Sequence, residues 1–271
     1  MRRQLILLFY AFAREIAPFK RRQVKRAPLA LDGLDGFRAE INGKEFAVVG
    51  HGIGHRRATE AARRAFDSLP GAELVIGTGV VGALSSGLKP GDLILSDRLL
   101  TFDADGEVAE QVLAVGDSHL RAVGHSLARA GIAYSTGAIL SSHRVLATGA
   151  EKRRAKETTG AIAVDMETGA IATEAAARGL PFIAIRAVLD EVDDEVVGAE
   201  MADEDGNVRP LAATSYLIRN PATMLKLPKM IRNLSRATAA IADALTAIAH
   251  EGKAPADPRR APVPAARKRP R

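Results

Sequence analysis

The sequence predicts a single-domain α/β fold in which a central mixed sheet is flanked by helices on both faces. Short apolar runs alternate with amphipathic stretches along most of the 271 residues, and this alternation is typical of such folds. Several runs are continuously apolar, so both faces of the sheet must be covered. Apolar residues make up 47% of the chain, which is enough to form a sizeable core.

The expected strands are short apolar segments bounded by glycine or polar residues. They cover residues 5–10, 45–50, 74–77, 92–96, 133–140, 161–164 and 182–188. The expected helices carry apolar residues at helical spacing. They cover residues 11–22, 56–69, 118–130, 166–178 and 230–250. Pro18 is expected to break the first helix, because proline lacks an amide hydrogen and clashes with the preceding turn.

The chain divides into a body, residues 1–251, and a basic tail, residues 252–271. Within the body, residues 193–229 interrupt the alternation and are predicted to form a lid or a membrane-facing excursion. The tail is rich in proline and alanine and is predicted to be disordered. It holds seven basic residues and one acidic residue, so it accounts for the whole net charge of +6. The body is therefore neutral, which argues against nucleic-acid binding.

Composition excludes several classes of site. The chain has no cysteine, which excludes a disulfide framework, a thiolate nucleophile and a cysteine-based metal centre. His51 and His55 lie four residues apart, but the two glycines between them disfavour a shared helical face. We therefore expect no metal and no cofactor. The first apolar run is interpreted as a buried strand rather than a signal peptide, because Arg14 and Glu15 follow closely. No run is long enough for a transmembrane helix, and a cytoplasmic location is expected.

A glycine-rich segment, Gly77–Gly82, follows one predicted strand and is interpreted as a turn. A ligand can approach the backbone closely there, because glycine has no Cβ. The segment lacks the acidic ribose partner of a dinucleotide site and the Gly-Lys-Ser/Thr ending of a phosphate-binding loop. It therefore suggests a ligand site without identifying the ligand.

Carboxylates follow three other predicted strands. Asp165 and Glu167 begin a helix, where they either complement the helix dipole or accept hydrogen bonds from a ribose diol. Asp190 follows the last strand and is either a cap or a general acid whose pKa is raised by burial. Glu15 follows the first strand and is either a solvated side chain or a member of the same site. Ligand sites gather at the carboxyl ends of strands in such folds.

Together these segments resemble the purine/uridine phosphorylase superfamily, and most closely its methylthioadenosine/adenosylhomocysteine nucleosidases. The resemblance covers residues 5–250. Four motifs carry it, in the family's order: Gly52-Ile53-Gly54, Thr78–Gly82 continuing to Gly87–Asp92, Val164–Glu167, and Arg186–Asp190. Segments 203–206 and 209–211 are similar to the hopanoid-biosynthesis-associated nucleoside phosphorylases. That closer resemblance implies removal of adenine from adenosylhopane, leaving ribosyl-hopane.

The resemblance implies a role for each matching residue. Glu167 would hold the ribose hydroxyls, with Met166 packing against the sugar. Asp190 would protonate N7 of the departing adenine, and Glu15 would position the attacking water. The other substrate-binding residues expected from the matching motifs are Asp165, Gly79, Val80, Val145 and Leu146. The superfamily also implies a homo-oligomer.

Departures from the family pattern affect the expected reaction. Leu189 stands where a serine often precedes the catalytic acid, and Val145 stands where an aromatic residue stacks on the base. The pocket should therefore be aliphatic. Gly77 and Val80 replace an arginine and a serine that bind phosphate in phosphorolytic relatives, so we expect hydrolysis.

Three alternatives remain open at this level. They are phosphorolysis giving a 1-phosphate sugar, a methylthioadenosine/adenosylhomocysteine nucleosidase, and a non-catalytic protein that binds a membrane surface. Residues 224–232 mix apolar and basic side chains, which is typical of a peripheral contact with a bilayer or of an ordinary surface segment. Replacing Asp190 separates an enzyme from a binding module.

Overall fold

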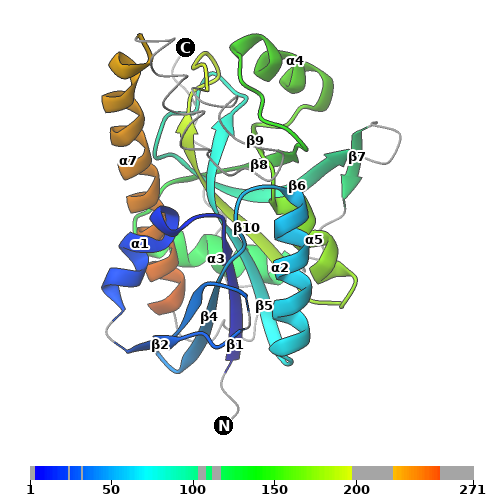
Figure 1. Ribbon diagram of the computed structural model, residues 1–271, viewed down its shortest axis with the longest axis vertical. Coiled ribbons are helices and arrows are strands. Elements are labelled where there is room, and N and C mark those ends of the chain that lie inside the picture. Colours follow the sequence, from blue (N-terminus) through cyan, green and yellow to red (C-terminus); the bar gives the residue numbers. More distant parts are fainter. Residues whose placement is uncertain are drawn as a thin grey trace.

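One mixed sheet of ten strands forms the centre of the fold (Figure 1). The computed structural model describes residues 4–23, 25–31, 33–102, 108–111, 117–196 and 222–250. The strands are β1 (Gln4–Tyr10), β2 (Arg26–Pro28), β3 (Gly36–Ile41), β4 (Lys44–Gly50), β5 (Ala72–Ala83), β6 (Leu93–Phe102), β7 (Val108–Gln111), β8 (Tyr134–Ser141), β9 (Ala163–Asp165) and β10 (Phe182–Asp190). The helices are α1 (Ala13–Arg22), α2 (His55–Ser68), α3 (Asp117–Arg129), α4 (Gly149–Thr159), α5 (Thr168–Ala176) and α7 (Ala222–His250).

The strand order is β10-β6-β8-β9-β5-β1-β4-β3-β2, and β7 pairs with β6. Strand β10 also pairs with β5, so β5, β9, β8, β6 and β10 close into a ring. Strand β1 lies parallel to both β4 and β5, whereas β6 runs antiparallel to β10. The sheet is therefore mixed, as predicted.

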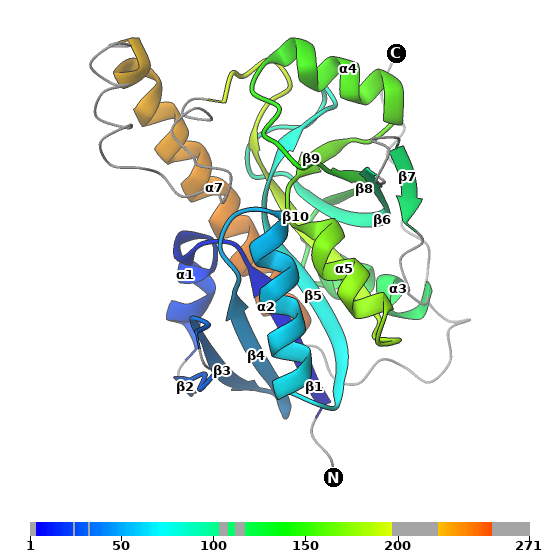
Figure 2. The ribbon, with the colours of Figure 1, turned by 45° about the vertical axis from the view of Figure 1, so that its right-hand side comes forward.

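Alternate side chains of β1 point to opposite faces of the sheet and into two different cores. Ile6, Leu8 and Tyr10 point into a core shared with α1, α3 and α7, whereas Leu7 and Phe9 point into a core shared with α2 and α5. This alternation follows from the two-residue period of a strand. Figure 2 shows α2 and α5 on one side of the sheet and α1 with α7 on the other. The predicted α/β fold with both faces covered is confirmed.

Two local predictions are wrong. Residues Gly77–Gly82 lie inside β5 and form no turn, because β10 pairs with them along their length, from Ala184 opposite Gly77 to Asp190 opposite Gly82. Helix α1 continues through Pro18. The missing amide removes one helical hydrogen bond, but Ile16 and Phe19 are buried on either side and their packing holds the helix together.

Four elements were not predicted: β2, β3, β7 and α4. Helix α4 has a polar surface and one buried residue, Lys152, so apolar periodicity does not reveal it. Its start does carry a local signal, since Thr148 and Glu151 form a reciprocal capping box.

The final helix begins earlier than predicted. Helix α7 starts at residue 222 and continues through Pro228, so the last part of the segment predicted as an excursion is helical. Ala237, Ile241, Leu245 and Ile248 are buried against the sheet. The rest of that segment from residue 197, and the tail from residue 252, lie outside the described residues. No helix in the described ranges is both long enough and apolar enough to cross a bilayer.

Candidate active site

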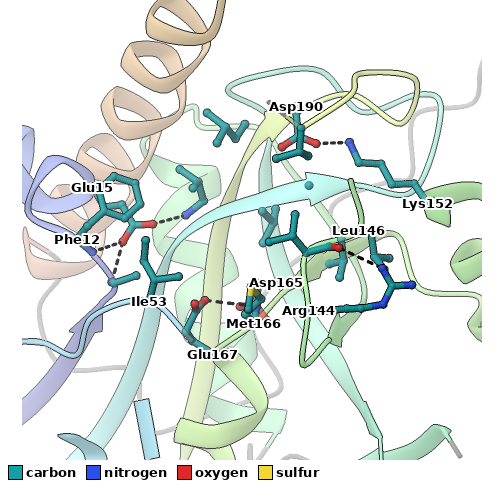
Figure 3. A pocket seen from close by; sticks show the side chains of 18 residues that line it. Phe12, Glu15, Ile53, Arg144, Leu146, Lys152, Asp165, Met166, Glu167 and Asp190 are labelled. Atoms are coloured by element: carbon teal, nitrogen blue, oxygen red, sulfur yellow. Dashed lines mark hydrogen bonds and ion pairs between the residues drawn. The ribbon is translucent and has the colours of Figure 1, made fainter. Parts of the chain in front are cut away.

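A cavity lies where β1, β5, β9 and β10 end (Figure 3). Of the nine residues predicted for the site, eight line it: Glu15, Val80, Val145, Leu146, Asp165, Met166, Glu167 and Asp190. The exception is Gly79. The lining also includes Phe12, Ile53, Val81, Leu189 and Val196. The strand ends therefore gather the predicted carboxylates around one largely aliphatic space.

Glu15 is fixed by backbone amides at the start of α1. Its side chain is 1% exposed. One carboxylate oxygen, Oε2, accepts hydrogen bonds from the amides of Ala11 at 2.8 Å and Phe12 at 3.2 Å. The other, Oε1, accepts one from the amide of Val80 at 2.9 Å. Burial raises the pKa of Glu15, and these three hydrogen bonds oppose the shift.

Gly79 lies behind the cavity wall and makes room for two charged groups. A Cβ at this position would lie 2.6 Å from Glu15 Oε1 and 2.6 Å from Arg186 Nη1. Its φ of +140° is also unfavourable for other residues. The glycine thus allows Glu15 and Arg186 to approach β5.

Arg186 is the largest fully buried side chain of the described residues. Its guanidinium forms an ion pair with Asp165 at 2.8 Å. It also donates to Thr168 Oγ1 at 2.9 Å and to the carbonyl oxygen of Thr78 at 2.7 Å. Asp165 accepts hydrogen bonds from the amide and hydroxyl of Thr168, the first residue of α5. Asp165 Oδ2 therefore serves both the start of the helix and Arg186.

Glu167 connects this cluster to the early glycine motif. Its side chain is buried, and Oε1 accepts a hydrogen bond from the amide of Gly54 at 2.8 Å. Burial and the nearby charge of Asp165 raise the pKa of Glu167 to about 7, and Arg186 opposes this shift. The turn before α2 and the turn before α5 are thus joined through one carboxylate.

Asp190 forms an ion pair with Lys152, which sequence analysis missed (Figure 3). The Lys152 side chain is fully buried and also donates to the carbonyl oxygens of Glu191 at 2.9 Å and Asp194 at 2.9 Å. Burial raises the pKa of Asp190, whereas the charge of Lys152 opposes the shift. The capping box of Thr148 and Glu151 was the signal that could have placed Lys152 on a helix.

The cationic side chains of the described lining are both paired with acids. They are Lys152, which contacts Asp190, and Arg144, which contacts Glu151 at 2.5 Å. An anionic ligand would have to compete with these carboxylates.

The raised pKa of Glu167 predicts a pH-dependent stability. Folding favours its protonated form, so that contribution is complete below the unfolded value of 4.5 and is lost as pH rises through about 7. Glu167→Gln imitates the protonated form and lacks this dependence. The unfolding free energy of the wild type relative to Glu167→Gln should therefore fall by about 3 kcal/mol between pH 4.5 and 8 in urea titrations.

Glu60→Gln is the matched control, because Glu60 is an exposed glutamate of α2 paired with Arg64. The difference in unfolding free energy between Glu60→Gln and the wild type should change little between pH 4.5 and 8. If the difference in unfolding free energy between Glu167→Gln and the wild type also does not change with pH, the electrostatic environment described for Glu167 is contradicted.

The chain is similar in sequence to known proteins of one family. The phosphorylase superfamily model matches residues 6–216. A 5′-methylthioadenosine/S-adenosylhomocysteine nucleosidase of Actinobacillus succinogenes is 32% identical over 173 residues, which cover 59% of this chain and 74% of the relative.

Two solved structures share the fold. A nucleosidase of that same type from Neisseria meningitidis, in complex with methylthio-immucillin-A, has a TM-score of 0.71 at 23% identity and covers 91% of this chain and 99% of its own. Futalosine hydrolase of Helicobacter pylori has a TM-score of 0.66 at 18% identity and covers 89% of this chain and 97% of its own. The match over most of the chain, the closed ring of strands and the cavity at the strand ends together show that this chain is an enzyme that belongs to the phosphorylase superfamily.

Proposed function

We propose that the protein hydrolyses the N-glycosidic bond of an adenine nucleoside. The observation that carries the proposal is the gathering of Glu15, Glu167 and Asp190 around one cavity. The relatives support it by their names, which are those of nucleosidases and a futalosine hydrolase. Each carboxylate has a distinct environment, and so each is suited to a distinct role.

Asp190 is the proposed general acid. Adenine is a poor leaving group as an anion, so protonation at N7 lowers the barrier to bond cleavage. Burial raises the pKa of Asp190, which increases the protonated fraction near neutral pH. This environment suits proton donation better than that of an exposed aspartate.

Glu167 is the proposed ligand of the ribose hydroxyls. Its Oε1 accepts one backbone hydrogen bond, and each carboxylate oxygen can accept two. Met166 would pack against the sugar, and Val80, Val145 and Leu146 would form the aliphatic wall. Asp165 would act indirectly, by fixing the start of α5.

Glu15 is the proposed partner of the attacking water. Its Oε1 accepts a single hydrogen bond from Val80, so capacity remains for a water proton. The sugar develops positive charge in the transition state, and buried carboxylates stabilise it. Phosphate is disfavoured, because the cations of the described lining already have acidic partners.

Adenosylhopane is the proposed substrate. The aliphatic lining, which includes Ile53, Val80, Leu189 and Val196, supports a hydrophobic 5′ substituent. Methylthioadenosine or adenosylhomocysteine is the second candidate, favoured by the relatives' names.

We also propose a peripheral contact with the cytoplasmic face of a membrane, by which the lipid-linked substrate would reach the cavity. Near the start of α7, Met230 is 42% and Ile231 62% exposed. The exposed Lys226 lies one turn before Met230, and the exposed Lys229 directly precedes it. Such a mixture is suited to the interface of an anionic bilayer. A homo-oligomer remains an expectation from the superfamily.

Asp190→Asn should lower adenine release by about 10²–10⁴-fold, because the proton donor is lost. Asp193→Asn is the matched control, since the Asp193 side chain is 76% exposed and its variant should retain wild-type rates. Thermal unfolding verifies that both variants are folded. A folded Asp190→Asn variant with wild-type activity would refute the assignment, and a wild type without activity would favour a non-catalytic binding protein.

The nucleophile and substrate are tested in one experiment. Adenosylhopane and methylthioadenosine are each supplied with and without phosphate, in water enriched in ¹⁸O. We expect adenine release without phosphate, ¹⁸O in the free sugar, and a higher kcat/KM for adenosylhopane. Release only with phosphate and a 1-phosphate product would show phosphorolysis. A preference for methylthioadenosine would refute the lipid-linked substrate.

Membrane contact predicts co-sedimentation with vesicles that contain an anionic lipid, at low salt. The double change Met230→Ser and Ile231→Ser should reduce the bound fraction, because the exposed apolar area is lost. Thr158→Ser on the exposed part of α4 should leave it unchanged. Equal binding by both variants, or none by the wild type, would contradict the contact.

A further inference from the structure

The acid proposed to protonate the base has a partner that neither the motifs nor the predicted helices indicated. Lys152 lies on α4, and its side chain is fully buried against the segment that follows β10. A buried ammonium is costly unless its charge and all its hydrogens have partners. This placement therefore requires an explanation beyond surface charge.

We propose that Lys152 is a positioning residue that holds Asp190 in its proton-donating position. The inference rests on the proposed function, in which Asp190 is the general acid. Leu189, the residue before Asp190, has no side-chain donor, so the orienting side-chain contact of Asp190 comes from Lys152.

The hydrogen bonds of Lys152 distinguish positioning from direct catalysis. An ammonium group has three hydrogens, and Lys152 has three acceptors: Asp190 Oδ2 and the carbonyl oxygens of Glu191 and Asp194. No hydrogen remains for a substrate. Because Oδ2 is engaged by Lys152, proton delivery is assigned to Oδ1.

The start of α4 is anchored beside the same segment. The carbonyl oxygen of Ala147 accepts a hydrogen bond from the amide of Val196 at 2.8 Å. A Cβ at Gly149 would lie 3.1 Å from the carbonyl oxygen of Val192. The helix that carries Lys152 is thus packed directly on the chain that leaves Asp190.

The side-chain contacts of the segment that follows β10, residues 191–195, are weaker than the contact of Lys152 with Asp190. Its four acidic side chains form ion pairs with cations of the loop before β6, α4 and α7: Glu191 with Lys89, Asp193 with Arg153, Asp194 with Lys229, and Glu195 with Lys226. Each cation is about half exposed or more, and exposed pairs contribute only about 0–1 kcal/mol. Lys152 is the buried contact among them, so its loss is expected to affect Asp190 most.

The charges around Asp190 determine the direction in which the pH dependence of kcat/KM should shift when Lys152 is changed. Lys152 of α4 and Lys229 of α7 favour its ionised form, whereas Asp194 disfavours it. A general acid must be protonated, so kcat/KM falls as pH rises through its pKa. Removing the charge of Lys152 should raise that pKa and move the alkaline limb to higher pH.

The test compares Lys152→Met and Lys152→Gln with Lys156→Met. Lys156 lies on the same helix but is only partly buried, and its ammonium donates to the carbonyl oxygen of Gly160 in a solvent-exposed hydrogen bond. Both Lys152 variants should lose about 10²-fold in kcat, because the acid is misplaced, with little change in KM. Their alkaline limb should move up by about one pH unit. Lys156→Met should match the wild type in both respects.

A second readout does not depend on activity. Titration of the ¹³C-labelled Asp190 carboxyl by NMR should show a higher pKa in the Lys152→Gln variant than in Lys156→Met. Wild-type kcat and an unmoved alkaline limb in folded Lys152 variants, or an unchanged carboxyl pKa, would overturn the inference. A wild type without adenine release refutes the proposed function instead, and the NMR titration still tests the pairing. If Lys152→Met does not fold, Lys152→Gln carries both measurements.

Discussion

The buried guanidinium of Arg186 is the interaction on which the site depends. A fully buried charge must be paired, and Arg186 meets this requirement through β5, through Asp165 and through the first residue of α5. Fixing Asp165 fixes the start of α5, and with it the position of Glu167. The close approach of Arg186 to Gly79 also places it beside Glu15. One cation thus sets the relative positions of carboxylates that are far apart in the chain.

The described part of the site is rich in fixed acceptors, and the two cations of its lining, Lys152 and Arg144, are paired with acids. Glu15 and Glu167 are held by backbone amides, and Asp190 is held by Lys152. Fixed groups of this kind do not have to reorganise when positive charge develops on a sugar. The same arrangement gives an incoming anion little to bind. These electrostatics are the basis for proposing water rather than phosphate as the nucleophile.

The sequence allowed the fold and most of the site to be predicted, and the failures share a cause. Continuous apolar runs predict buried strands, and their ends predict where Glu15, Glu167 and Asp190 lie. The glycine run was predicted as a turn. It is a strand because it pairs with β10, and that pairing joins residues about one hundred positions apart, which a local pattern does not reveal. Lys152 was missed because α4 buries one polar residue and no apolar face. Local patterns do not contain such long-range partners.

The difference between the buried and exposed pairs around the segment 191–195 has a consequence for evolutionary divergence. In each of the four outer pairs the cation is about half exposed or more, so it can be replaced at little cost. Lys152 and Asp190 are constrained differently, since losing either leaves a buried charge without its counterion. Relatives that retain the aspartate without the lysine should therefore carry another hydrogen-bond donor nearby. The two positions are expected to covary, while the acidic run beside them drifts freely.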